Sequence, residues 1–343
     1  MITHPAHDVT FMYSSTVIAT TGERFSDFAP YVASVNDAGI VAFQATMPGG
    51  GTGVFTGSGG EVAEVPGLAL VAGVTSHPDL NQAGDTSFYG DRAGGGQGVF
   101  LLRAGRLLTI ADTRDAFSTI GPAGPTMNEA GMVAFRANRT AAVSGIFAWD
   151  GAAVVTVADT EGPWSRFHGL PVATGDQRVV FRADRKDGVE GIYAGRAGSI
   201  RTIAETGDRF EDLAFFPSVD GDGTVAFAAT LRDGGPAIVV VDEGGSTRIL
   251  ETGGAFESYR GALIAADGAV VRIATPAGGS LGLFSGPDPG ADRILAIGDP
   301  LLGSTVKEFA SNPVSVNAAG QVAIRVTLAD SRQLILRADP DAG

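Results

Sequence analysis

Short apolar runs and turn-forming residues alternate along the whole chain with a period of about 46 residues. Most periods contain a four-residue turn with Asn or Asp first and Gly last, followed by apolar residues such as Val41-Ala42-Phe43. Asn and Asp close a turn with their own side chains, and Gly adopts the positive φ that a hairpin requires. The pattern therefore predicts pairs of short antiparallel strands joined by tight turns.

Seven copies of this turn can be aligned. They begin at Asn36, Asn81, Asn128, Thr174, Asp220, Ala265 and Asn317, and the copies at Thr174 and Ala265 are degenerate. Subtraction gives spacings of 45, 47, 46, 46, 45 and 52 residues, so only the last unit carries an insertion. Repeats of roughly 40 to 50 residues built of four short strands are typical of a β-propeller. We therefore expect seven blades.

Later apolar runs in each unit supply the remaining two strands of a blade. Residues 53–55, 98–100 and 145–147 are Gly-Val-Phe or Gly-Ile-Phe triplets and predict a third strand. Residues 108–111, 155–158 and 201–204 predict a fourth, outermost strand. Fifty glycines and seventeen prolines agree with many short strands and turns rather than helices.

The two ends of the chain complete each other in this arrangement. The seventh unit stops after residues 334–337 without an outermost strand, whereas residues 16–22 precede the first turn and resemble residues 202–207. We predict an all-β fold: a seven-bladed β-propeller of four-stranded antiparallel blades, closed by an N-terminal strand that completes the last blade. Residues 1–343 then form one domain. Closing the ring removes the exposed sheet edges that favour aggregation.

The recurring Asn-x-x-Gly-x-Val-Ala-Phe signature resembles the motif of the tandem NxxGxxAF-repeat family, and the likeness extends from about residue 16 to residue 337. That family comprises bacterial proteins that are commonly exported and often anchored at the cell surface. The resemblance implies a propeller-like repeat architecture and supplies no catalytic residues. This chain shows neither a recognisable export signal nor a C-terminal anchor, which departs from the usual setting of the family.

Net charge and hydropathy narrow the classes of partner. The net charge is −14 and the basic residues form no large cluster, which argues against binding to nucleic acid or to an anionic membrane. No apolar stretch approaches the roughly 20 residues of a transmembrane helix. Residues 1–10 contain no basic segment followed by an apolar core. We expect a cytoplasmic protein, or a secreted one if a signal peptide has been removed, and a monomer or weak homo-oligomer.

The residue types also limit the available chemistry. The absence of cysteine excludes disulfides, thiolate nucleophiles and cysteine-ligated metals. Residues 220–223, Asp-Gly-Asp-Gly, resemble the start of a calcium loop. They fall on the repeated hairpin turn, however, and no downstream Glu completes a set of ligands. We predict no metal ion and no other cofactor.

We expect function on the face that carries the loops between the outermost strand of one blade and the innermost strand of the next. Variable loops on a rigid scaffold commonly carry binding residues, and the turns on the opposite face look short and tight. At the entry to the innermost strand, Tyr31, His77, Arg260 and Asn312 are unlike their equivalents in other repeats. A residue that departs from an internal repeat is a better functional candidate than one that follows it.

Nine residues are candidates for a site on that face. The catalytic candidates are His77, His168, Tyr31 and Arg260, and the ligand-binding candidates are Trp164, Phe167, Phe215, Asn312 and Ser76. The histidines suit a general base, the Tyr an acid and the Arg an oxyanion or carboxylate clamp. Each residue also has a structural interpretation, because loop histidines and aromatic residues in repeat proteins often only fill space between blades.

These residues are compatible with three classes of function. The first is binding of a small molecule in a preformed pocket at the loop face of the central channel. The second is an acid–base enzyme, such as a lyase, isomerase, cyclase or hydrolase, that uses a histidine base in the same pocket. The third is a platform for protein–protein interaction. Propellers host all three, so the fold does not decide between them.

Overall fold

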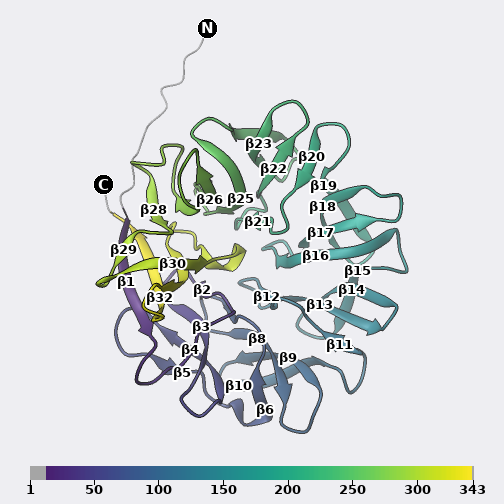
Figure 1. Ribbon diagram of the computed structural model, residues 1–343. Helices are drawn as coiled ribbons and strands as arrows, with labels where there is room; N and C mark the ends of the chain where they lie inside the picture. Colours follow the sequence, from purple (N-terminus) through teal and green to yellow (C-terminus); the bar gives the residue numbers. More distant parts are fainter. Residues whose placement is uncertain (1–12, 342–343) are drawn as a thin grey trace.

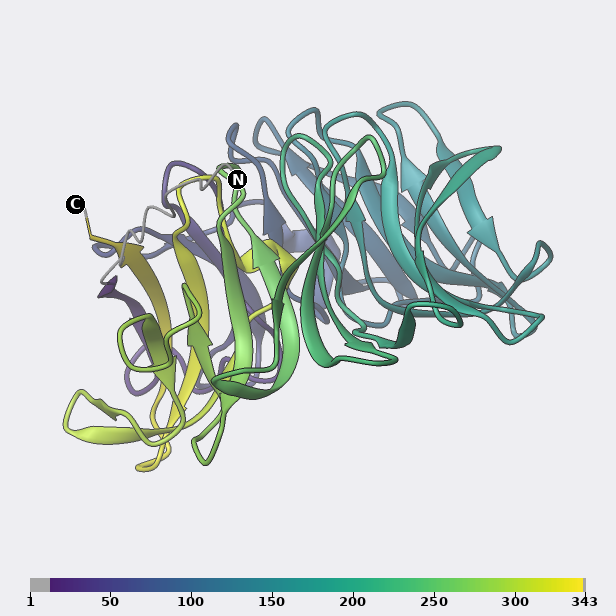
Figure 2. The same cartoon turned by 90° about the horizontal axis from the view of Figure 1, so that it is seen from above.

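Seven antiparallel sheets stand around a central axis in the computed structural model, which describes residues 13–341 (Figure 1). Each sheet is one blade, and consecutive blades follow the chain around the ring. Figure 2 shows the ring from the side, with the strands running between its two faces. The prediction of an all-β, seven-bladed propeller is confirmed.

The first four blades contain strands β2 to β19. Blade 1 consists of β2 (Ser34–Val35), β3 (Val41–Thr46), β4 (Thr52–Gly57) and β5 (Ala63–Glu64). Blade 2 consists of β6 (Val71–Val74), β7 (Asp79–Leu80), β8 (Thr86–Arg92), β9 (Gln97–Arg103) and β10 (Arg106–Asp112). Blade 3 consists of β11 (Thr119–Ile120), β12 (Thr126–Met127), β13 (Val133–Thr140), β14 (Val143–Trp149) and β15 (Val154–Asp159). Blade 4 consists of β16 (Trp164–Ala173), β17 (Val179–Arg185), β18 (Glu190–Arg196) and β19 (Ser199–Glu205).

The last three blades contain the remaining strands. Blade 5 consists of β20 (Phe210–Leu213), β21 (Ser218–Val219), β22 (Val225–Leu231), β23 (Gly235–Val241) and β24 (Thr247–Thr252). Blade 6 consists of β25 (Phe256–Ile264), β26 (Val270–Pro276), β27 (Gly282–Phe284) and β28 (Arg293–Ala296). Blade 7 consists of β29 (Pro300–Leu301), β30 (Ser304–Ala310), β31 (Val322–Leu328), β32 (Gln333–Pro340) and β1 (Tyr13–Thr20). The two short 3-10 helices are η1 (Leu68–Leu70) and η2 (Pro313–Ser315). No helix in residues 13–341 is long and apolar enough to span a membrane.

The N-terminal strand closes the ring as predicted. β1 pairs antiparallel with β32, and Val17 lies opposite Leu336. Ile18 is buried in the same hydrophobic cluster as Phe43 of blade 1 and Ile335 of blade 7. The closing strand therefore completes blade 7 by main-chain hydrogen bonds and joins blades 7 and 1 by apolar packing.

The Asn that begins most turns makes two kinds of hydrogen bond. Its Oδ1 accepts the N–H of the residue four places later, as in Asn36 with Ile40 at 3.0 Å, which closes the turn. Its Nδ2 donates to a carbonyl of the next blade: Asn317 to Asn36 at 2.8 Å, Asn36 to Asn81 at 3.1 Å and Asn128 to Thr174 at 2.7 Å. A carboxylate has no hydrogen to donate, so this second bond explains why Asn dominates the signature.

The innermost strand is interrupted midway in several blades. A Pro recurs three residues before the turn in blades 2 to 5, at Pro78, Pro125, Pro171 and Pro217. Proline has no N–H for a ladder hydrogen bond. In blade 4 the pairing therefore jumps from His168 opposite Arg182 to Val172 opposite Val180. The residues in between leave the ladder on the strand nearest the axis (Figure 1).

Two expectations about the loops are wrong. Trp164 and His168 belong to strand β16 rather than to a loop, because the innermost strand begins earlier than the apolar pattern indicated. The face with the short turns is also not uniformly tight, since residues 285–292 form an open loop between β27 and β28. Pro287 and Pro289 cannot donate to a ladder, so they stop the pairing of these two strands.

Candidate functional site

Ser76 and His77 are buried in blade 2. The Ser76 hydroxyl accepts the N–H of Tyr89 at 2.8 Å and donates to the His77 carbonyl at 2.7 Å. The His77 ring lies against Gly124 of blade 3, where any Cβ would overlap the ring. Burial lowers the pKa of His77 to about 4, and a hydrogen bond to the Pro125 carbonyl opposes this shift only in part. His77 is therefore a neutral side chain enclosed by packing.

Trp164 and Phe167 fill the interior around blade 4. Both are buried in one apolar cluster with Phe181 and Tyr193. The Trp164 ring packs edge-on against Tyr193, with ring centroids 4.4 Å apart. Phe167 lies 5.9 Å from Phe181 by the same measure. Their rings are thus occupied by core packing and are not open to a ligand.

Tyr31, Arg260 and Asn312 lie in three other blades. Asn312 begins η2, and its side chain accepts the N–H of Val314 at 3.0 Å. Tyr31 is half-buried, and burial together with the charge of Asp91 raises its pKa. Arg260 is exposed on β25, and its side chain makes no hydrogen bond or ion pair with residues 13–341. No hydrogen bond or ion pair in the described part of the chain joins any two of the four catalytic candidates.

His168 and Phe215 meet at the border between blades 4 and 5. The His168 imidazole stacks on the Phe215 ring, with centroids 5.4 Å apart and 25° between the planes. His168 Nε2 lies 2.7 Å from Oδ2 of Asp184. The His168 side chain is 13% exposed, whereas Phe215 is 53% exposed. An oriented imidazole therefore adjoins an open aromatic surface.

The Asp184 carboxylate fixes the tautomer of His168. An ionised carboxylate only accepts hydrogen bonds, so Nε2 carries the proton in the neutral ring. The other ring nitrogen, Nδ1, makes no hydrogen bond with residues 13–341 and keeps its lone pair. In this arrangement a histidine can accept a proton from a bound molecule.

Arg182 connects the His168 side of the site to the segment that carries Phe215. Its guanidinium lies 4.8 Å from the centroid of the Phe215 ring. Its Nε donates to the Leu213 carbonyl at 3.1 Å. The same group pairs with Asp184 at 3.4 Å and with Glu190. Arg182 is buried, so these contacts hold Asp184 and the blade 5 backbone in fixed positions.

Arg136 of blade 3 holds the backbone on both sides of His168. Its Nη2 donates to the Phe167 carbonyl at 2.7 Å, and its Nη1 donates to the Gly169 carbonyl at 3.1 Å. Burial lowers the pKa of Arg136, and the like charge of Arg166 lowers it further. Arg136 therefore places positive charge close to His168, and Arg166 adds to the positive charge around Arg136.

Gly169 allows blades 4 and 5 to approach each other at this point. Its φ is +56°, and a Cβ at this position would overlap the carbonyl oxygen of Phe215. Only glycine tolerates both the backbone conformation and the contact. The interruption of β16 after His168 is thus what brings Phe215 into stacking distance.

Sequence reasoning found His168 and Phe215 but missed Arg136, Arg182 and Asp184. The position eight residues after the start of each turn carries a signal for the arginines: it is occupied by Gln44, Tyr89, Arg136, Arg182, Ala228, Ile273 and Arg325. This position lies on the second strand of each blade, between packed sheets. A buried Arg is rare unless it is paired, so a charged residue there indicates a polar site.

A cavity of about 410 Å³ lies on the axis, where the innermost strands end. The residue just before each turn forms an apolar collar around it: Val35, Leu80, Met127, Ala173, Val219, Ile264 and Val316. The buried Asp79 also lines this cavity, and burial raises its pKa to about 7 although two backbone N–H groups oppose the shift. None of the nine candidate residues is among those that line it.

Solved structures with similar folds are propellers of distant sequence. An oligogalacturonate lyase in complex with manganese superposes with a TM-score of 0.61 at 11% identity, with 96% of each chain covered. The oligogalacturonate lyase of Vibrio parahaemolyticus gives a TM-score of 0.58 at 11% identity, over 96% of this chain and 97% of that one. A puromycin-hydrolyzing peptidase of Mycobacterium tuberculosis gives 0.57 at 15% identity over 91% of this chain, which spans only 52% of the peptidase chain.

Comparison at the level of sequence finds less. No family model matches the sequence, and no curated protein matches it. At identities of 11% to 15%, the likeness to solved structures shows the propeller fold and nothing finer. Membership of the NxxGxxAF-repeat family stays a prediction.

Proposed function

We propose that this protein binds a small carboxylate-bearing molecule on the surface formed by His168 and Phe215, beside the buried guanidinium of Arg182. The observation that carries the proposal is the stacking of an imidazole, held by Asp184 at 2.7 Å, on an aromatic ring that is 53% exposed. The exposed ring offers a flat apolar surface to the body of a ligand, and the adjacent cationic groups attract its charge. The residues that hold this surface are fixed by buried hydrogen bonds, so binding needs little further ordering.

The local charge supports an anionic ligand. The whole chain has a net charge of −14. Arg136 and Arg182 contact the residues beside His168, and Arg166 lies near enough to Arg136 to lower its pKa. Two carboxylates, from Asp184 and Glu190, pair with Arg182. This positive excess in an acidic protein would raise the local concentration of small anions.

Acid–base catalysis by His168 is a second candidate function, favoured by the Asp184 contact. Nδ1 is free to take a proton, and the carboxylate would stabilise the imidazolium that forms. The reaction class that fits is removal of a proton next to a carboxylate, as in an elimination or an isomerisation. Oligogalacturonate lyases share the propeller fold, so digalacturonate is a suitable carboxylate to test.

Calorimetry with matched aromatic probes tests the binding proposal. The probes are 3-phenyllactate and its neutral amide, which share the same body and differ in the carboxylate. We expect the acid to bind more tightly than the amide. Phe215→Ala should weaken binding of the acid about tenfold, because it removes the aromatic surface.

A second exposed apolar side chain provides the control for this experiment. Leu302→Ala removes a side chain that is 51% exposed on the β29–β30 hairpin, and it should leave the affinity unchanged. Equal binding of acid and amide, or unaltered affinity in Phe215→Ala, would contradict the proposal.

Ultraviolet absorbance tests the catalytic candidate. Elimination from digalacturonate creates a conjugated alkene, whose absorbance reports turnover. If the wild-type protein forms it, His168→Gln should reduce the rate roughly a hundredfold or more. The control is Asn138→Gln, a change at a partly exposed residue of blade 3 that should leave the rate unaltered. Equal rates for His168→Gln and the wild type would remove His168 as the base.

A further inference from the structure

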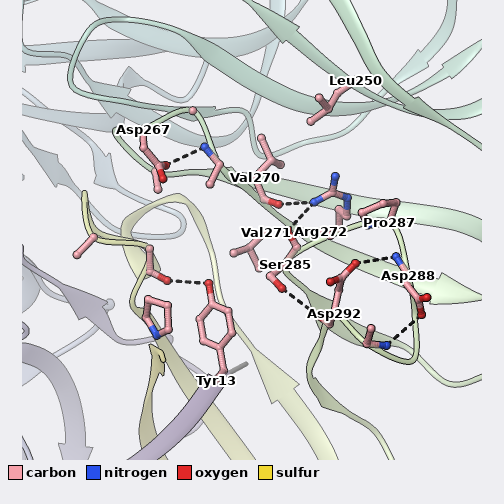
Figure 3. A pocket seen from close by; sticks show the side chains of 18 residues that line it. Tyr13, Leu250, Asp267, Val270, Val271, Arg272, Ser285, Pro287, Asp288 and Asp292 are labelled. Atoms are coloured by element: carbon pink, nitrogen blue, oxygen red, sulfur yellow. Dashed lines mark hydrogen bonds between the residues drawn. The ribbon is translucent and has the colours of Figure 1, made fainter. Parts of the chain in front are cut away.

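A second cavity, of about 560 Å³, opens between blades 6 and 7 (Figure 3). Its lining comes from the first turn of blade 6, the loop of residues 285–292, Tyr13 of β1 and Leu250 of β24. It therefore lies on the face that carries the hairpin turns, whereas His168 lies midway along the innermost strand of blade 4. The volume falls in the range of ordinary ligand sites.

The loop of residues 285–292 is built around one carboxylate. Asp292 accepts the Asp288 N–H on its Oδ2 at 2.8 Å, and its own N–H bonds back to the Asp288 carbonyl at 2.9 Å. The Ser285 N–H donates to the Asp292 carbonyl at 2.8 Å. A Cβ on Gly286 would overlap the Asp292 carboxylate, so glycine is needed at that position. The carboxylate is thus held in one place, and Asp292 is only 8% exposed.

Two buried side chains that line the cavity have polar atoms without a partner. Asp292 Oδ1 accepts no hydrogen bond from residues 13–341. Arg272, which is 6% exposed, donates from Nε to Glu251 and from Nη1 to the carbonyls of Val270 and Ser285. Its Nη2 has no partner in the described part of the chain. Both side chains stand among the lining residues in Figure 3. Neither atom is itself fully buried, although the residues that carry them are more than nine-tenths buried, so each is open to a partner in the cavity.

The lining carries an excess of negative charge. Asp267, Asp288 and Asp292 contribute three carboxylates. Arg272 is the single cationic residue among the lining residues, and Glu251 neutralises it at 2.6 Å. Tyr13 adds no charge, because burial and the nearby Asp267 raise its pKa to about 12. The cavity therefore favours a cation, in contrast to the surface around His168.

Apolar groups cover the rest of the wall. Leu250, Val271, Pro287 and Pro340 line the cavity, together with the ring of Tyr13. A strongly hydrated inorganic cation gains nothing from such walls, whereas an organic cation with an apolar body buries surface against them.

We propose that this cavity binds a small organic amine that has an apolar body and a hydrogen-bond acceptor. The ammonium group meets Asp292 Oδ1, and the acceptor meets Nη2 of Arg272. One molecule then gives both unpaired atoms a partner and places its apolar body against Leu250 and Val271. The site is independent of the anion surface at His168.

Calorimetry at low ionic strength tests the proposal with phenylalaninol and N-acetylphenylalaninol. The two probes share the ring and the hydroxyl acceptor, but only the first is a cation at neutral pH. We expect phenylalaninol to bind at least tenfold more tightly than its acetylated form. Asp292→Asn keeps an oxygen for the Asp288 N–H and removes the charge, so it should abolish that preference.

A charge-matched control separates the cavity from the general charge of the protein. Asp233→Asn removes one exposed carboxylate on the turn between β22 and β23 and should leave phenylalaninol binding unchanged. Leu250→Asn provides a second variant at the exposed edge of the cavity, and it should weaken binding of both probes by removing apolar contact. Equal affinity for the two probes, no saturable binding of phenylalaninol, or an unchanged preference in Asp292→Asn would overturn the proposal.

Discussion

Asp79 occupies a repeat position where other blades place a hydroxyl. At this position Thr126, Ser218 and Ser315 use their hydroxyls to bond the main chain of the next blade. Asp79 accepts the Met127 N–H at 2.7 Å in the same way, but an ionised carboxylate cannot also donate. Burial raises the pKa of Asp79 to about 7. The carboxyl group therefore keeps its proton up to neutral pH and can donate it in a hydrogen bond.

Asp79 and His77 should give opposite pH dependences of stability. The folded state holds the Asp79 proton up to about pH 7, whereas the unfolded state loses it near 3.8, so this stabilisation is lost as the pH rises from 4 to 7. His77 has a pKa of about 4 when folded and 6.5 when unfolded, so its contribution is lost as the pH falls from 6.5 to 4. Each effect is on the order of 3 kcal/mol, and in the wild type the two largely cancel.

Single substitutions should separate the two contributions. In Asp79→Asn only the His77 effect remains, so the free energy of unfolding in urea should increase from pH 4 to 6.5. In His77→Asn only the Asp79 effect remains, and the same quantity should decrease from pH 4 to 7. Profiles parallel to the wild type in both variants would show that neither group is buried as described.

Gly169 should be the most sensitive glycine at the candidate site. Gly169→Ala combines a positive φ with overlap of the Phe215 carbonyl, and we expect it to lower the free energy of unfolding by at least about 2 kcal/mol. Gly221→Ala is the control, because a Cβ there meets no atom within 4 Å. Urea denaturation compares the two. Similar stabilities would mean that blades 4 and 5 do not approach each other as closely as described.

At the scale of strands, the sequence predicts hairpins better than it predicts contacts between blades. Extending the blade 4 hairpin from Val172 opposite Val180 without interruption would place His168 opposite Asp184. The observed break shifts His168 to Arg182, yet Asp184 remains within 2.7 Å of Nε2. The proximity of His168 and Asp184 could therefore have been predicted from the sequence. The stacking of Phe215 was not, because it depends on how two blades pack.

The strand boundaries illustrate the same limit. Apolar alternation and turn residues predicted the second and third strands, which are regular in most blades. They did not predict that Trp164 begins a strand or that residues 285–292 open into a loop. The loop depends on Pro287 and Pro289, which cannot donate ladder hydrogen bonds, and the burial of Trp164 depends on its packing against other strands.

The Asn signature leads to a prediction about one turn. Asn317→Asp keeps the oxygen that closes the turn but loses the hydrogen bond from Nδ2 to Asn36 across the junction of blades 7 and 1, together with the one to Gln321 within the turn. We expect it to lower the free energy of unfolding by about 1 to 2 kcal/mol, measured by urea denaturation. Asn81→Asp is a matched control, because Asn81 Nδ2 makes no hydrogen bond to another blade within residues 13–341. An equal loss in both variants would contradict the role assigned to the amide.

At the scale of the whole molecule, stability depends on the closing strand. A chain that begins after residue 20 lacks β1 and exposes the edge of β32. We expect it to self-associate in sedimentation experiments and to lose a single cooperative unfolding transition. A chain that begins at Tyr13 retains the strand and should unfold like the full-length protein. Monomeric, cooperative behaviour without β1 would show that the ring does not need this closure.

The overall architecture was almost fully predictable, whereas the function was not. Seven aligned turns and an unpaired first strand determine a closed ring, because each blade repeats the same local pattern. Both proposed ligand sites lie where the repeat is broken, at His168, Arg182 and the loop of residues 285–292. The first is proposed for an anion and the second for a cation, so the two sites can be tested independently.

The central claim, that His168 and Phe215 form a ligand site, is tested most directly by NMR of protein labelled with 13C at histidine. The His168 ring signals are assigned with His168→Gln, and 3-phenyllactate is then titrated. We predict saturable shifts of the His168 signals, no shift of the buried His77, and loss of the effect in Phe215→Ala. Saturable binding that leaves the His168 signals unmoved, or titration curves unaltered by Phe215→Ala, would contradict the account.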